Sequence, residues 1–196
     1  MNNHVDDVHR GGMRNVWIIT ISMTILAVCY TMIIPFLPIY LLELGVSKDD
    51  VALWSGLVFG ITFLIAGIMA PIWGKIADNK GKKRMALRAG FAIAVSYFLI
   101  GLVTDQYQLL LGRAFVGFAN GFYPAAMTMV SLSVDEKRVG RALGIFQMGL
   151  ILGNVIGPFL GGAVESVVGM RPVFYVSGIA VFIATLAVLF FVKEPR

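Results

Sequence analysis

Long apolar runs without a single charged residue constrain this chain more than any other feature. Residues 51–73 form one such run of 23 residues, and residues 15–42 form another of 28 residues. A helix rises about 1.5 Å per residue, so about 20 residues cross the roughly 30 Å hydrocarbon core of a bilayer. Both runs are long enough to do so. The pattern therefore predicts transmembrane helices.

The overall composition supports a membrane protein and excludes several other classes. Hydrophobic residues make up 58% of the chain and charged residues 14%, whereas soluble domains have about 45–50% and about 25%. The net charge of +5 does not indicate nucleic-acid binding, because the cations lie in short segments between apolar runs. The single cysteine, Cys29, leaves no intrachain disulfide and no metal-ligand spacing, and His4 and His9 have no nearby nucleophile or acid. We expect no nucleic-acid partner, no metal, no cofactor and no enzymatic activity.

Six spans are expected between a leader, residues 1–15, and a short tail, residues 193–196. The first apolar run is too long for the core of a signal peptide, which has about 7–15 residues, so we expect a retained helix. No soluble domain or low-complexity tract separates the spans, which indicates one helical bundle over residues 16–192. The expected helices are about 16–42, 51–73, 86–103, 108–130, 142–164 and 172–192.

Lysine and arginine are distributed unequally between the two sides of this bundle. Of 16 such residues, 13 lie in the leader, the segments 74–88 and 131–141, and the tail. The opposite loops hold only Lys48 and Arg171. Cations concentrate in cytoplasmic loops, so both termini are expected in the cytoplasm of a multi-pass protein of the plasma or inner membrane. Arg88, near the cytoplasmic end of its span, is expected to extend toward the interface.

A strongly basic turn, GKIADNKGKKR at residues 74–84, joins the second and third expected spans. It resembles the G-x-x-x-D-R/K-x-G-R/K-R/K signature of the major facilitator superfamily, although Asn79 stands where a cation is usual. Asp78 is the one acid among six cations between Lys75 and Arg88. The resemblance implies a conformational latch between this acid, helix termini and basic groups. The latch residues are Gly74, Asp78, Gly81, Lys82, Lys83 and Arg84.

The fourth expected span contains an arginine, Arg113. An arginine within a span costs about 3 kcal/mol, so its side chain is expected in a protein or water-filled interior. Alternatively, the Arg113 side chain extends to the nearby outer interface of the membrane. Arg113 and Gly117 resemble the superfamily motif R-x-x-x-G, which implies a role in coupling to protons or substrate. Asn120 and Tyr123 are candidate substrate-binding residues or, alternatively, hydrogen-bonding contacts between helices.

The fifth expected span carries glycines at intervals of four residues from Gly149 to Gly161. Such spacing makes a groove for close helix packing, which is the simpler interpretation. The run also resembles the G-x-x-x-G-P-x-x-G-G motif of facilitator antiporters, which implies export. Gln147 and Asn154 share a helix face and are candidates for the substrate site or for packing amides. The antiporter motif comprises Gly153, Gly157, Pro158, Gly161 and Gly162.

The first expected span resembles the first helix of drug:proton antiporters in the segment YTMIIPFLPIY. Tyr30 is a further candidate substrate-binding residue, and Pro35 and Pro38 permit bending. Many such antiporters bind protons with a carboxylate inside the membrane. All 11 acids of this chain lie in the leader, tail, loops or helix ends. The proton-binding acid is therefore expected in another half of the protein, or at Asp78 or Asp105.

Together these resemblances imply an all-α membrane protein whose six helices form two inverted three-helix repeats, the amino-terminal half of a twelve-helix transporter. They imply secondary active transport, with proton-coupled efflux of hydrophobic drug-like compounds by alternating access. Export of a small metabolite or sugar is an alternative, and so is a non-transporting membrane module. The expected partners are the lipid bilayer, protons, a small hydrophobic substrate and a second six-helix half, which is either a missing carboxy-terminal half or a second copy.

The orientation makes a direct prediction for thiol labelling. In a Cys29→Ala background, single cysteines at Lys82 and Lys137 should resist a membrane-impermeant thiol reagent added outside, because the positive-inside rule places them in the cytoplasm. Cysteines at Lys48 and Glu165 should react. The reverse labelling pattern would contradict a six-span bundle with both ends inside.

Overall fold

The computed structural model describes residues 2–193, and the regular structure in that range is helical throughout. Met1 and most of the predicted tail, residues 194–196, lie outside the described residues. The predicted leader is not a separate segment, because its described part is continuous with the first helix. The elements are α1 (Asn2–Ile33), the 3-10 turn η1 (Ile34–Phe36), α2 (Leu37–Glu43), α3 (Val51–Lys80), α4 (Lys82–Gly101), α5 (Gln106–Ala119), α6 (Phe122–Leu132), α7 (Glu136–Val168) and α8 (Met170–Phe191).

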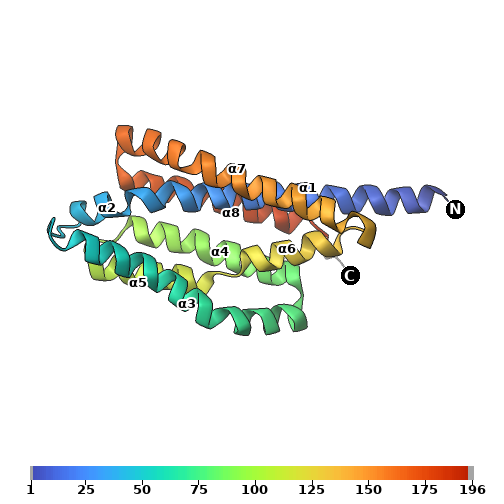
Figure 1. Cartoon of the computed structure of the whole chain (residues 1–196), viewed down its shortest axis with the longest axis horizontal. Coiled ribbons are helices and arrows are strands. Elements are labelled where there is room, and N and C mark those ends of the chain that lie inside the picture. Colours follow the sequence, from blue (N-terminus) through green and yellow to red (C-terminus); the bar gives the residue numbers. More distant parts are fainter. Residues whose placement is uncertain (1, 194–196) are drawn as a thin grey trace.

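The helices lie roughly along one common direction (Figure 1). In that view α1, α7 and α8 form one side of the bundle, α3 and α5 form the other, and α4 and α6 lie between them. The most extensively packed pairs are α1 with α7, α4 with α8 and α3 with α5. The start of α1 and the end of α8 lie at the same end of the bundle, as an even number of crossings requires.

Five helical segments of the described chain are long and apolar enough to cross a membrane. These segments overlap five of the six predicted spans. The first predicted span changes from α-helix to a 3-10 turn at η1, where Pro35 follows Ile34, and the bending that its prolines permit stays a prediction.

The fourth predicted span is not one helix, so the prediction of a continuous helix over 108–130 is wrong. The chain leaves the helix at Asn120, where ψ is 152°, and turns at Gly121, where φ is +142°. This φ is strained for residues with a Cβ, which explains the glycine. Pro124 follows within the first turn of α6; in a continuous helix its ring would clash with the carbonyl of Asn120. Gly121 and Pro124 were the sequence signals for this break.

The predicted turn over residues 74–84 is also wrong in extent. Helix α3 continues through Lys75 and Asp78 to Lys80, and only Gly81, with φ +97°, separates it from α4. An uncharged run shows which residues can lie in the hydrocarbon core of a bilayer. It does not show where the helix ends, because charged residues can also be helical. Lysine forms helices well, so the helix extends past the apolar run until glycine ends it. Helix α7 likewise begins before the predicted residue 142 and ends after 164.

The glycines of the fifth predicted span form the contact between α7 and α1. A Cβ atom at Gly153 would lie 2.7 Å from the carbonyl oxygen of Thr24 on α1, and Gly157 and Gly161 face α1 backbone in the same way. Thr31 adds a hydrogen bond from its Oγ1 to the carbonyl oxygen of Gly153, at 3.3 Å. Close packing, the simpler interpretation of this motif, is what the structure has. Gly162 differs, since only the Phe36 ring lies near it.

This packing predicts a position-specific loss of stability. Gly153→Val should lower the free energy of unfolding by about 1–3 kcal/mol or more, because the added side chain forces α7 away from α1. Gly144→Val is the matched control on the same helix, since no atom lies within 4 Å of its Cβ position. The measurement is thermal unfolding in lipid or detergent. Equal losses for the two variants would show that helix propensity alone is responsible.

Candidate functional site

Two of the cavities among the described residues share the broken fourth span as part of their walls. The first, here called the central cavity, has a volume of about 390 Å³. Five aromatic side chains and three uncharged polar ones give its wall most of its chemistry, and no Asp, Glu, Lys or Arg lines it. Its described lining residues are Met23, Leu26, Ala27, Tyr30, Thr62, Phe63, Ile93, Tyr97, Val116, Asn120, Phe122, Tyr123, Leu150 and Asn154.

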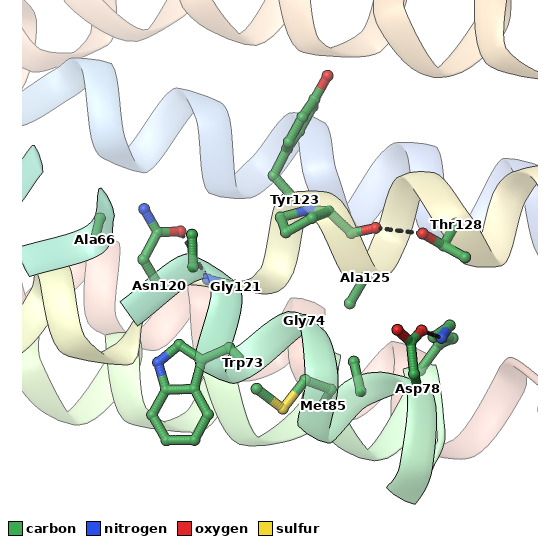
Figure 2. Close-up of a pocket in the computed structure, with 14 residues that line it drawn as sticks. Ala66, Trp73, Gly74, Asp78, Met85, Asn120, Gly121, Tyr123, Ala125 and Thr128 are labelled. Carbon is green, nitrogen blue, oxygen red and sulfur yellow. Dashed lines mark hydrogen bonds and ion pairs between the residues drawn. The ribbon is translucent and has the colours of Figure 1, made fainter. Parts of the chain in front are cut away.

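The second, here called the end cavity, has a volume of about 350 Å³ and lies between α3, α4 and α6. Figure 2 shows Trp73 and Met85 on one side of it, Asn120 and Tyr123 on the other, and Asp78 at one end. Asn120 and Tyr123 line both cavities. These two residues are therefore the shared wall.

Four of the five predicted substrate-binding residues line the central cavity: Tyr30, Asn120, Tyr123 and Asn154. The fifth, Gln147, lines neither cavity. Its Nε2 donates a hydrogen bond to the Tyr123 hydroxyl oxygen at 3.0 Å, so it contacts the site through that side chain. Sequence reasoning missed Thr62, Phe63, Tyr97 and Phe122. A phenylalanine within an apolar span does not stand out as a candidate cavity residue. Thr62 and Tyr97 are polar residues in apolar runs, so the sequence offered a weak signal for them.

Arg113 is fully buried, with 0% of the residue exposed, and does not line either cavity. Its Cζ lies 5.9 Å from the centre of the Tyr30 ring, and none of its three guanidinium nitrogens has a hydrogen-bond partner among the described residues. The side chain is thus inside the protein, and the alternative of extension to the outer interface does not describe this structure. Gly117, one turn later, faces the carbonyl oxygen of Thr62 and allows α5 to approach α3 closely.

The predicted latch residues occupy several different environments. Asp78 forms an ion pair with Lys82 across Gly81, and both side chains line the end cavity together with Gly74. Lys83 instead donates a hydrogen bond to the carbonyl oxygen of Leu189, at 2.8 Å, and so contacts the end of α8. Arg84 is exposed.

Arg88 does not extend toward the interface as the sequence predicted. Its guanidinium stacks on Trp73, with Cζ 3.6 Å from the ring centre. Its Nη2 donates hydrogen bonds to the carbonyl oxygens of Ala119 at 3.2 Å and Asn120 at 3.4 Å. The guanidinium of Arg88 therefore points toward the break in the fourth span. The sequence offered no sign of this contact.

Comparisons with known proteins agree with this fold. The sequence profile of the Major Facilitator Superfamily matches residues 19–196. The chain is 39% identical over 182 residues to a Proteus mirabilis protein named multidrug resistance protein MdtG, and 38% identical to its namesake from Dickeya zeae. Each match covers 92% of this chain and 45% of the relative. The chain therefore spans about half the length of the curated relatives it matches.

Solved structures show the same fold at lower sequence identity. The human organic anion transporter MFSD10 superposes with a TM-score of 0.82 at 17% identity, over 94% of this chain and 48% of that protein. PepTSo, a transporter of the POT family, superposes with a TM-score of 0.83 at 16% identity, over 93% of this chain and 38% of that protein. The predicted fold class, one six-helix half of a facilitator-type transporter, is confirmed. The chain is a multi-pass membrane protein that belongs to the Major Facilitator Superfamily.

Proposed function

We propose that this chain forms half of a secondary active transporter that exports hydrophobic, drug-like compounds by alternating access, driven by protons. The observation that carries the proposal is the central cavity, which is aromatic and free of formal charge in its lining. Such a wall binds apolar rings by surface burial and offers amides and hydroxyls for orientation. The names of the Proteus and Dickeya relatives support the same conclusion.

The cavity chemistry also suggests which compounds this half accepts. Tyr30, Tyr123 and Phe63 present aromatic rings, while Asn120 and Asn154 present uncharged amides. A cation would find only ring faces here, and no carboxylate. We propose neutral or anionic aromatic compounds as the substrates favoured by this half. A sugar exporter would instead need more convergent hydrogen-bonding groups, because each buried hydroxyl of the substrate needs a partner.

Proton coupling is proposed to involve Arg113. A buried guanidinium without a hydrogen-bond acceptor raises the free energy of the folded protein. An anionic partner that binds Arg113 in one state of the transport cycle and leaves it in another would therefore change the relative stability of the two states strongly. The described acids lie near helix ends or in loops, with Asp78 near the end of α3. The partner is therefore proposed to be a carboxylate of a second half, or an anionic substrate.

A second six-helix half is proposed to cover α3 and α7. Their most apolar windows are only 11% and 22% buried within the described bundle, compared with 44–50% for the other three membrane-length segments. Asn120 and Asn154 are exposed, and a polar amide against lipid tails costs free energy. A partner bundle would both cover these faces and close the central cavity. We also propose that the termini are cytoplasmic and that the membrane is the cell membrane.

The test is efflux by a fusion of this chain to the remaining part of the Proteus mirabilis relative. Cells that express the fusion should retain less of a neutral hydrophobic fluorescent dye, and a protonophore should abolish the difference. The chain expressed alone should not export dye, because one wall of the cavity is missing. Robust export by the isolated chain as a monomer would contradict the half-transporter proposal, and competition by sugars in everted vesicles would favour metabolite export.

Arg113 variants should separate coupling from folding. In the fusion, Arg113→Ala should abolish dye-dependent proton movement. Arg113→Lys should restore it only in part, because lysine keeps the charge but lacks the planar fork that binds a carboxylate through two hydrogen bonds. Membrane expression, measured in parallel, is the control. Wild-type export by Arg113→Ala would limit this residue to a structural role.

A further inference from the structure

The break in the fourth span creates a hydrogen-bonding problem inside the membrane. The last carbonyl groups of a helix have no intrahelical donor, and α5 ends at Ala119 in the middle of a predicted span. In lipid each such group needs a partner from the protein. Closing the break would still leave the carbonyl of Asn120 without a backbone donor, because Pro124 has no N–H to offer it.

Two side chains from neighbouring helices supply the missing donors. Trp73, on α3, donates from Nε1 to the carbonyl oxygen of Phe118 at 2.8 Å. Arg88, on α4, donates to the next two carbonyl oxygens, those of Ala119 and Asn120. The guanidinium also stacks on the Trp73 ring, so the two donors hold each other in place. We call Trp73 and Arg88 the carbonyl clamp.

The clamp lies directly against the residues that separate the two cavities. Trp73 and Gly121 line the end cavity, and Asn120 lines both cavities (Figure 2). The Oδ1 atom of Asn120 accepts a hydrogen bond from the backbone N–H of Gly121 at 2.8 Å, which leaves its amide N–H groups for a ligand. Tyr123 follows in the first turn of α6, so its position also depends on the angle at the break.

We propose that Trp73 and Arg88 are positioning residues of the transport site: by clamping the broken fourth span they set where Asn120 and Tyr123 lie in the cavities. The proposal rests on the proposed function only in treating those two residues as part of the substrate site. The charge of Arg88 suits this role, since the carboxyl end of α5 carries partial negative charge and a charged donor makes the stronger hydrogen bond.

The first experiment measures the angle at the break and needs no transport. Spin labels at Leu111 on α5 and Leu132 on α6, both exposed, report the distance between the two helix segments in a lipid bilayer. Cys29 is replaced by alanine, and the clamp is varied by Arg88→Gln, Arg88→Lys and Trp73→Phe. The matched control is Arg138→Gln, which removes an exposed cation near the start of α7.

The unsubstituted clamp and Arg138→Gln should give one narrow distance distribution. Arg88→Gln should broaden or shift it, because two carbonyl groups lose a charged donor, and Arg88→Lys should restore it in part. Trp73→Phe keeps an aromatic ring beside the Arg88 cation but removes the indole N–H, so it should change the distance distribution in the same way and to a smaller extent. It also provides a test of the clamp if Arg88→Gln fails to fold. Wild-type distributions for Trp73→Phe and for every folded Arg88 variant would overturn the proposal.

The second experiment measures transport of the neutral dye by the fusion protein. Arg88→Gln should raise the apparent KM roughly tenfold, with a smaller change in maximal rate, as expected when a charged hydrogen bond that positions binding groups is lost. An equal loss of maximal rate in all variants at unchanged KM would indicate a merely structural clamp and overturn the proposal. If the unsubstituted fusion does not transport, the proposed function fails, and the distance measurement still decides the clamp.

Discussion

Inside a hydrocarbon layer every backbone N–H and C=O group must find its partner within the protein. This constraint explains why the described chain is helical and where its side chains take unusual positions. At the carboxyl end of α4, the hydroxyls of Tyr40 and Tyr175 donate to the carbonyl oxygens of Ile100 and Gly101. At the break in the fourth span, Trp73 and Arg88 do the same for α5. At both places, carbonyl groups at a helix end receive donors from other helices.

Close approach of helices supplies the second part of the architecture. Lipid tails are as apolar as leucine, so helices associate through packing and hydrogen bonds rather than through exclusion of water. The glycines of α7 let α1 approach until backbone meets backbone, and Gly117 does the same for α5 against α3. These two contacts hold α1 and α3 in place, and both helices contribute to the wall of the central cavity. The motif that suggested export thus acts first as a packing surface.

Two arginines at membrane depth show how differently one residue type is used. Arg88 donates to two carbonyl oxygens through Nη2 and stacks on an indole ring, while its Nε has no hydrogen-bond partner among the described residues. Arg113 is fully buried, and none of its guanidinium nitrogens has a hydrogen-bond partner among the described residues. A buried donor group without an acceptor costs free energy, whereas a donor group with a hydrogen-bond partner stabilises the fold. The contrast fits the positioning role proposed for Arg88 and makes Arg113 the stronger candidate for a change of partner.

The sequence alone determined the class of this protein, since uncharged runs of membrane length and a basic motif do not depend on any distant contact. It also made Tyr30, Asn120, Tyr123 and Asn154 candidates for a substrate site, with contacts between helices as the alternative for the last three. All four line the central cavity. Only the tertiary structure decided that Trp73 and Arg88 turn toward the break in the fourth span, whose position Gly121 and Pro124 signal locally. Those outcomes depend on which donors lie beside freed carbonyl groups, and such neighbours come from helices that are distant in sequence.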